Sequence, residues 1–145
     1  MIQIKKADLN EINNIYNLIR NDTYINWPIE SLKHEIENNF CLSALSNNTL
    51  VGFLSAAIIE NTEAQITAIY VKKEFRKNKI GTSLLSKLSN ECLNHNINTI
   101  ILEVGNNNKI ALSFYNKNGF IQYGNRQKYF NNKEDAVLLK KFIPL

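Results

Sequence analysis

The chain has 145 residues, of which 44% are hydrophobic and 21% charged, with a formal net charge of +4 and a pI near 9.0. This composition predicts a single globular domain with a substantial core and excludes a disordered chain. The modest positive charge favours an anionic partner such as a phosphorylated cofactor and does not by itself indicate nucleic acid. No basic-then-apolar leader opens the sequence and its apolar runs are too short to span a membrane, so we expect a cytoplasmic protein without membrane contact.

The first part of the chain predicts a strand followed by two helices. Residues 1–7 alternate apolar and polar side chains, as a strand does, and residues 8–20 repeat apolar side chains at helical spacing. Asp8 and Glu11 have the spacing of a capping box, which would begin this first helix. A second helix is predicted over residues 27–40, with Pro28 in its first turn.

The rest of the chain predicts a mixed sheet. Residues 40–46, 49–60 and 63–73 are strand-like with no helix between them, which indicates an antiparallel meander. A helix from about Ile80 to His95, a strand at 99–104 and a short helix ending before Gly119 then indicate a parallel strand pair. Strands at 120–124 and 134–142 complete an α+β fold, with a mostly antiparallel sheet of about seven strands and about four helices.

A basic turn precedes the third predicted helix. Residues 74–85 read EFRKNKIGTSLL, with three cations ahead of a single glycine. Backbone N–H groups at a helix N-terminus bind phosphate well, particularly beside cations. Because strand ends and the following helix starts gather at one edge of a parallel pair, we expect this turn to face a ligand crevice.

The segments AIYVKKEFRKNKIGTSLL and LEVGNNNKIALSFYNKNGF, in this order, resemble the GNAT superfamily of acetyl-coenzyme A dependent N-acetyltransferases, most closely over residues 68–120. The resemblance implies a pyrophosphate loop of the form Q/R-x-x-G-x-G/A. In this chain the loop and the residue after it are Arg76, Lys77, Asn78, Lys79, Ile80, Gly81 and Thr82. Lys79 replaces the first glycine, and in a left-handed conformation it would carry a strain of about 1 kcal/mol.

The resemblance also implies the rest of the cofactor site and its catalytic groups. The backbone of Ile69 and Val71, with Tyr70 between them, would hold the pantetheine arm as an added strand would. Asn108 and Tyr115 would line the thioester end.

Within the superfamily, the chain is most similar to the ribosomal-protein-alanine N-acetyltransferases of the RimI type. The early Trp27-Pro28 pair and the late segment RQKYFNNKEDAVLLKK carry this similarity, together with the LEV and FYNKNGF segments. An Arg-x-x-Tyr-Tyr motif is usual in that type, whereas here the second aromatic residue is Phe130 and the following turn is shorter. The similarity implies that Trp27, Tyr129 and Phe130 contact the acceptor.

Acetyl transfer to an amine requires a neutral nucleophile, a polarised thioester carbonyl and a proton for the departing thiolate. An α-amino group has a pKa of about 7.7 to 8.0, against about 10.4 for lysine, so an N-terminal acceptor needs only modest deprotonation, which Glu103 could provide through water. Tyr115 could act as the general acid, and a backbone N–H at the end of the 69–71 strand could polarise the carbonyl. No metal is required, and Cys41 and Cys92 give no support for a metal site or an acetyl-enzyme.

Each of these residues also has a purely structural interpretation. Glu103 could be the polar position of an edge strand, Tyr115 a core residue, and the basic turn a solvated surface. Trp27 could be a hydrophobic staple and Asn108 a helix N-cap. The two histidines, His34 and His95, are predicted to be surface residues.

Three functions therefore remain open. The first is transfer of an acetyl group to the N-terminal amine of a protein, such as a ribosomal protein, by direct attack in a ternary complex. The second keeps the reaction but uses a polyamine, an amino acid, an aminoglycoside or a lysine side chain as acceptor. The third is a non-catalytic module that senses coenzyme A or binds RNA. Acidic residues in the acceptor cleft would favour a polyamine, and a groove between Trp27 and Tyr129 would favour a peptide.

Overall fold

The structure is a computed structural model that describes residues 1–130 and 133–144. Its strands are β1 (Ile2–Lys6), β2 (Phe40–Ser46), β3 (Thr49–Ile59), β4 (Glu63–Val71), β5 (Thr99–Gly105), β6 (Ile121–Phe130) and β7 (Glu134–Phe142). Its helices are α1 (Ile12–Ile19), α2 (Ile29–Asn38), α3 (Ile80–Asn94) and α4 (Lys109–Lys117), with 3-10 turns at Leu9–Glu11 and Lys73–Phe75. The predicted order of strands and helices is confirmed.

The helix starts follow local sequence signals, with one difference. The Asp8 side chain accepts the N–H of Asn10, and Glu11 Oε1 accepts the N–H of Asp8 at 3.1 Å, so the predicted capping box is present. Pro28 is the N-cap of α2 and precedes its first turn, because its ψ of 158° is extended. In the described part of the chain, no helix is long and apolar enough to cross a membrane.

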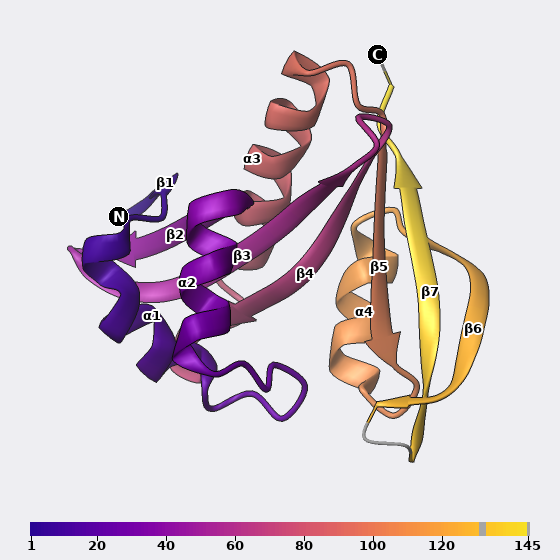
Figure 1. Ribbon diagram of the computed structural model, residues 1–145, viewed down its shortest axis with the longest axis horizontal. Helices are drawn as coiled ribbons and strands as arrows, with labels where there is room; N and C mark the ends of the chain where they lie inside the picture. The colour runs from indigo at the N-terminus through magenta and orange to yellow at the C-terminus, as the bar shows by residue number, and fades with distance from the viewer. Residues whose placement is uncertain (131–132, 145) are drawn as a thin grey trace.

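The seven strands form one mixed sheet in the order β1-β2-β3-β4-β5-β7-β6. Every neighbouring pair is antiparallel except β4 and β5, which run parallel over three residue pairs, from Glu63↔Thr99 to Gln65↔Ile101. Beyond these pairs the two strands diverge, which Figure 1 shows as a widening gap from the top of the sheet downward. The residues beyond Gln65 in β4 and beyond Ile101 in β5 therefore have no sheet neighbour on that side.

A β-bulge lies in β4 just beyond the parallel pairs. In β3, Ser55 pairs with Ala68 while the next residue, Ala56, pairs with Ile66, so Thr67 is the extra residue. The bulge places consecutive side chains on the same face, and the inside-outside alternation of β4 changes phase there.

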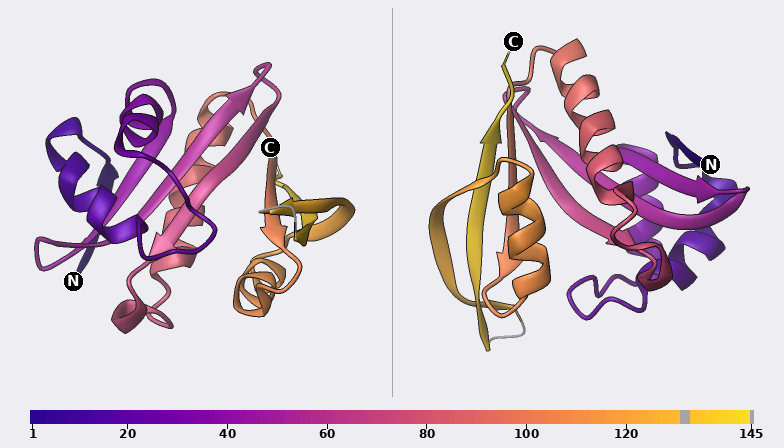
Figure 2. Two further views of the ribbon diagram at one scale, coloured as in Figure 1. Left: turned by 60° about the horizontal axis from the view of Figure 1, so that its bottom comes forward. Right: turned by 180° about the vertical axis from the view of Figure 1, so that it is seen from behind.

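Two hydrophobic cores cover the two faces of the sheet. Helices α1 and α2 pack on one face, where Phe53, Ala68 and Tyr70 are buried. Helices α3 and α4 pack on the other, as the view from behind in Figure 2 shows, where Leu84, Leu102 and Tyr115 are among the buried residues. The divergence of β4 and β5 can therefore be reached from both faces.

Strand β6 is longer than the sequence predicted. It continues through Phe130 instead of ending near Gly124, with register shifts against β7 on the way. Its residues are mostly exposed and polar, so their pattern gave no strand signal. The extension carries Arg126 and Tyr129 to the edge of the sheet that faces the acceptor side described below.

Candidate active site

The exposed backbone of β4 forms one side of the strand divergence. Lys72 donates its N–H to the Val51 carbonyl at 2.7 Å, which fixes the alternation of the antiparallel β3–β4 pair. By this alternation Tyr70 bonds to β3, whereas Ile69 and Val71 direct their N–H and C=O groups towards β5. Since β5 has diverged, these groups are open to an extended ligand, except that Arg76 Nε donates to the Val71 carbonyl at 2.8 Å.

Tyr70 is a correction to the predicted cofactor-binding set. Its backbone pairs with Phe53 of β3, and its side chain is buried in the core beneath α1 and α2. The Arg76 guanidinium lies over its ring, with Cζ 5.2 Å from the ring centroid. Tyr70 thus supports Arg76 and does not itself face the divergence.

The basic turn ends at the N-terminus of α3, as the sequence predicted. Lys79 is the N-cap, with φ 62° and ψ 19°, so it adopts the left-handed conformation expected for the missing glycine, and Lys77 has φ 70°. The first intrahelical bond runs from the Ser83 N–H to the Lys79 carbonyl, and no side chain caps the helix. The N–H groups of the first turn are therefore free to bind an anion, with three exposed cations beside them.

Gly81, a predicted residue of the pyrophosphate loop, also has a packing role. A Cβ built on Gly81 would lie 2.8 Å from Cζ and 3.0 Å from Cε1 of Phe114 in α4. The absence of a side chain therefore allows α4 to approach α3 closely. The Phe114 ring occupies the space that a side chain at position 81 would fill.

Helix α4 positions Asn108 and Tyr115. The Asn108 side chain accepts the N–H of Ala111 at 3.2 Å, so this residue is the helix N-cap. Tyr115 is buried between the rings of Phe114 and Phe120. Burial raises the pKa of Tyr115 above its ordinary value of about 10, and the Asp22 carboxylate on the α1–α2 loop adds to this shift. The phenol therefore keeps its proton across the physiological pH range.

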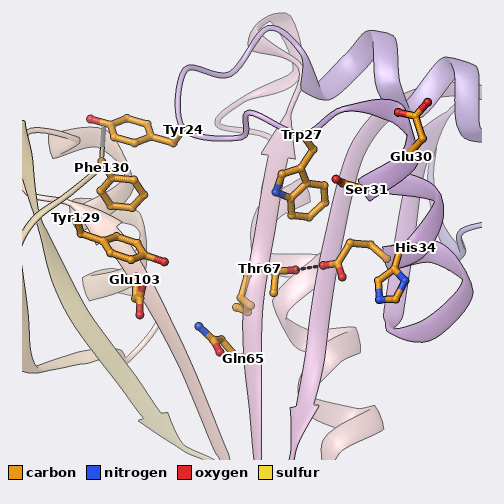
Figure 3. Close-up of a pocket in the computed structure, with 12 residues that line it drawn as sticks. Tyr24, Trp27, Glu30, Ser31, His34, Gln65, Thr67, Glu103, Tyr129 and Phe130 are labelled. Carbon is orange, nitrogen blue, oxygen red and sulfur yellow. Dashed lines mark hydrogen bonds between the residues drawn. The ribbon is translucent and has the colours of Figure 1, made fainter. Parts of the chain in front are cut away.

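A pocket of about 670 Å³ lies on the opposite face of the sheet, between α2 and the β6–β7 side (Figure 3). The predicted acceptor residues all line it, with Trp27 on one side and Tyr129 and Phe130 on the other, and Glu103 beside Tyr129. The complete set of lining residues is Tyr24, Trp27, Glu30, Ser31, His34, Glu35, Gln65, Ile66, Thr67, Glu103, Tyr129 and Phe130. This pocket is the candidate acceptor site.

Glu103 projects from β5 into this pocket and has two partners. Arg126 Nη2 lies 3.1 Å from Glu103 Oε1, and the Arg126 guanidinium stacks over the Tyr129 ring, with Cζ 4.7 Å from its centroid. A hydrogen bond with the Glu103 carboxylate raises the pKa of Tyr129. The carboxylate is mostly buried, with 15% of its side chain exposed, and its charge is balanced by Arg126.

Glu35 supplies a second carboxylate from the opposite side of the pocket. Its Oε1 accepts hydrogen bonds from Thr67 Oγ1 at 2.8 Å and from Ser55 Oγ at 3.2 Å, and its Oε2 accepts one from the side-chain amide of Asn39. No ion pair to Glu35 is formed among residues 1–130 and 133–144. The α2 side of the pocket therefore carries uncompensated negative charge, to which Glu30 adds.

Several pocket residues were not predicted from the sequence. His34, expected to be a surface residue, is exposed but lines the pocket, whereas His95 lies on the surface as expected. The polar side chains at positions 30, 31, 34 and 35 follow helical spacing beside the apolar face of α2, and this stripe was the signal available. Tyr24 and Thr67 had no sequence signal, because Tyr24 reaches the pocket through the α1–α2 loop and Thr67 through the β-bulge in β4.

The two cysteines are buried, and the described residues show no metal site. Cys41 and Cys92 are buried free thiols, and burial raises the pKa of each to about 11. They are therefore protonated and poorly nucleophilic at neutral pH. Within the described ranges, no three His, Cys, Asp or Glu side chains gather in a way that could hold a metal ion.

A protein-family model described as the acetyltransferase (GNAT) family matches residues 12–120, which include β4, the basic turn, α3, β5 and α4. A putative ribosomal protein bS18-alanine N-acetyltransferase of Bacillus subtilis is 28% identical over 140 residues, covering 94% of this chain and 92% of the relative.

The chain is also similar to two proteins of Thermoplasma acidophilum. A spermidine N(1)-acetyltransferase of Thermoplasma acidophilum is 37% identical over 79 residues, covering 54% of this chain and 48% of the relative. The solved structure of a PaiA N-acetyltransferase from Thermoplasma acidophilum, in complex with coenzyme A, superposes with a TM-score of 0.82 at 25% identity, covering 98% of this chain and 99% of that one.

Proposed function

This chain belongs to the acetyltransferase (GNAT) family and is an N-acetyltransferase, and from this premise we propose that it transfers the acetyl group of acetyl-coenzyme A to the N-terminal amine of a protein. The similarity to the ribosomal-protein-alanine N-acetyltransferases favours a ribosomal protein as the acceptor. Transfer proceeds by direct attack, since both thiols are buried and protonated.

The observation that carries this proposal is the arrangement of the two sites around one strand divergence. The free amides of α3 and the open backbone of Ile69 and Val71 lie along the divergence on the side of α3 and α4. The aromatic pocket lies on the side of α1 and α2. A cofactor and an acceptor can therefore approach the same point from opposite faces, as a ternary complex requires.

The residues present fit coenzyme A. The first turn of α3, with Arg76, Lys77 and Lys79 beside it, suits a pyrophosphate, and the open edge of β4 suits an amide-containing arm. When bound, acetyl-coenzyme A supplies the activated acetyl thioester. A backbone N–H of the 69–71 segment is placed to donate a hydrogen bond to the thioester carbonyl.

Two side chains can transfer the protons that the reaction requires. Tyr115 stays protonated because burial raises its pKa, so it can donate to the departing thiolate. Glu103 lines the acceptor pocket and can accept the proton of the attacking amine through water, with Arg126 and Tyr129 fixing its orientation. Tyr115 and Glu103 act from opposite faces of the sheet, because Tyr115 belongs to α4, which packs on the face of α3, whereas Glu103 projects from β5 into the pocket on the face of α1 and α2.

A single experiment tests reaction and acceptor together. The protein is incubated with acetyl-coenzyme A and small-subunit ribosomal proteins, and the modified residue is located by mass spectrometry. We expect acetylation of one N-terminal α-amine, and its absence in a parallel incubation with the Tyr115→Phe variant. Unmodified N-termini on every ribosomal protein would remove this acceptor.

A small cationic amine is the second candidate acceptor. The uncompensated carboxylates Glu30 and Glu35 in the pocket favour a positively charged acceptor, and one relative is named for spermidine. Comparing kcat/KM for N-terminal peptides with kcat/KM for polyamines distinguishes the two candidates. A non-catalytic module is not supported, because the family and the curated relative are acetyltransferases.

A further inference from the structure

The loop between α1 and α2, residues 20–28, crosses from one part of the sheet to the other. The Asp22 carboxylate holds its bend by accepting the N–H of Tyr24 at 2.6 Å and the N–H of Ile25 at 3.2 Å. The bend aims the Tyr24 hydroxyl at β7, where it donates to Glu134 Oε1 at 2.8 Å, with Oε2 at 3.0 Å. The hydrogen bond joins residues that are 110 positions apart.

This contact spans the divergence of β4 and β5. Those two strands share only three residue pairs, so the sheet itself connects the two parts of the molecule weakly on this side. Among residues 1–130 and 133–144, apart from the contact between the chain neighbours Asn98 and Thr99, no other side-chain hydrogen bond or ion pair joins the part before β5 to the part that begins with β5. The Tyr24–Glu134 bridge is therefore the polar link across the acceptor side.

Glu134 also connects the bridge to α4. Its Oε2 accepts the N–H of Asn107 at 2.5 Å, immediately before the N-cap of α4. Gly105 makes room for this arrangement, since a Cβ there would lie 2.5 Å from Glu134 Oε2 and 2.5 Å from Tyr24 Cε1. The close approach of both side chains requires glycine at this position.

The Tyr24 ring is part of the pocket that the bridge closes. It meets Phe130 edge to face, with the ring centroids 5.1 Å apart, and both residues line the pocket (Figure 3). Burial and the hydrogen bond to Glu134 raise the pKa of Tyr24 to about 12, so its hydroxyl remains a donor at physiological pH.

We propose that Tyr24 and Glu134 are positioning residues for the acceptor: their hydrogen bond holds the α1–α2 loop against β7 and fixes the distance between the two walls of the acceptor pocket. The proposal rests on the assignment of this pocket to the acceptor. When the Tyr24 hydroxyl is removed, Glu134 keeps the hydrogen bond from the Asn107 N–H before α4, so loss of the bridge should affect acceptor binding and leave coenzyme A binding unchanged.

Tyr24→Phe tests the proposal, because it removes the hydroxyl and keeps the ring against Phe130. We expect the KM of an acceptor that the wild-type protein acetylates to rise about 10-fold, the effect of losing a hydrogen bond to a charged group. We expect kcat to fall by less than about 3-fold and the Kd for coenzyme A to change by less than about 2-fold. Tyr123→Phe, on an exposed ring of β6, is the matched control and should change none of these.

Two further variants test whether the hydrogen bond itself is responsible. Gly105→Ala keeps both partners but forces them apart, so it should raise the acceptor KM as Tyr24→Phe does. In the double variant Tyr24→Phe/Glu134→Gln, the rise in acceptor KM should be smaller than the product of the two single effects, since Tyr24→Phe removes the hydrogen bond that Glu134→Gln weakens. A multiplicative rise overturns the proposal.

The remaining outcomes are also decisive. An unchanged acceptor KM in Tyr24→Phe overturns the proposal. A variant that binds both the acceptor and coenzyme A more weakly and also melts at a lower temperature overturns it too, because these changes together would indicate a general structural role. Amide hydrogen exchange of residues 20–28 provides a readout that needs no acceptor. Faster exchange in Tyr24→Phe supports the bridge even if no acceptor is acetylated. The absence of acetylation would count against the proposed function alone. Unchanged exchange overturns the bridge proposal.

Discussion

The proposed cofactor side and the proposed acceptor side of the strand divergence are built in different ways. On the proposed cofactor side, the groups available for binding are mostly backbone: the open edge of β4 and the free amides at the start of α3, all within residues 69–82. On the acceptor side, the groups are side chains from the α1–α2 loop, α2, β4, β5 and β6, with Glu134 of β7 supporting them.

The difference explains why the two regions respond differently to sequence change. A site made of backbone groups persists when its side chains vary, which is how Lys79 can occupy a glycine position with the turn intact. A pocket made of side chains changes its chemistry with each substitution. The acceptor side is therefore where relatives with one reaction can differ in substrate.

The largest expected effect lies where the two regions meet. Tyr115→Phe removes the proposed acid, and we expect kcat to fall by about 10²-fold or more while the Kd for coenzyme A changes by less than about 3-fold. Because burial raises the pKa of Tyr115, the wild-type rate should show no falling limb from this group below about pH 10. Steady-state kinetics and calorimetric titration with coenzyme A measure both quantities. Unchanged turnover would remove Tyr115 from the chemistry.

An intermediate effect is expected from a change confined to the acceptor side. Glu103→Gln should lower kcat/KM about 10-fold near pH 6.5 and less near pH 9, because an acceptor with a pKa of about 8 is mostly protonated at the lower pH. A pH profile of kcat/KM with a single peptide measures this, and Glu91→Gln, on the far end of α3, is the control. A loss that is equal at all pH values would contradict a base role.

The smallest expected effect comes from a change confined to the cofactor side. Lys79→Gly removes a left-handed non-glycine residue, so we expect the free energy of unfolding to rise by up to about 1 kcal/mol. The Kd for coenzyme A should change by less than about 2-fold, since the backbone amides remain. A 10-fold weaker Kd would show that the ammonium group, and not the backbone, dominates binding, and the contrast between the two regions would fail.

The sequence predicted the fold well because its signals are local. The capping box at Asp8, the apolar periodicity of α3 and the alternation of the strands each depend on neighbouring residues. Neither strand sequence marks the point at which β4 and β5 separate, because both segments remain strand-like beyond it. The extension of β6 was missed because its residues are exposed and polar.

In the candidate site, too, the residues with a local sequence signal were predicted and those that depend on long-range contacts were not. The turn at residues 76–82 and the N-cap Asn108 were predicted, because a motif of contiguous residues carries them. Tyr24 and Glu134 were not, since their contact depends on a loop crossing between residues 110 positions apart. Tyr70 was assigned wrongly because the phase of β3–β4 bonding, which turns its backbone away from the cofactor side, has no sequence signal.

The bulge at Thr67 makes β4 behave as two short strands in opposite phase. Before it, Ala64 and Ile66 face the α3 core, and after it, Ile69 and Val71 do so. Deleting this one residue would restore a strict two-residue repeat and exchange the faces of everything that follows, carrying Tyr70 under α3 and Val71 under α1. One inserted residue thus determines which β4 side chains face each of the two cores, and the chain cannot lose this residue without repacking both cores.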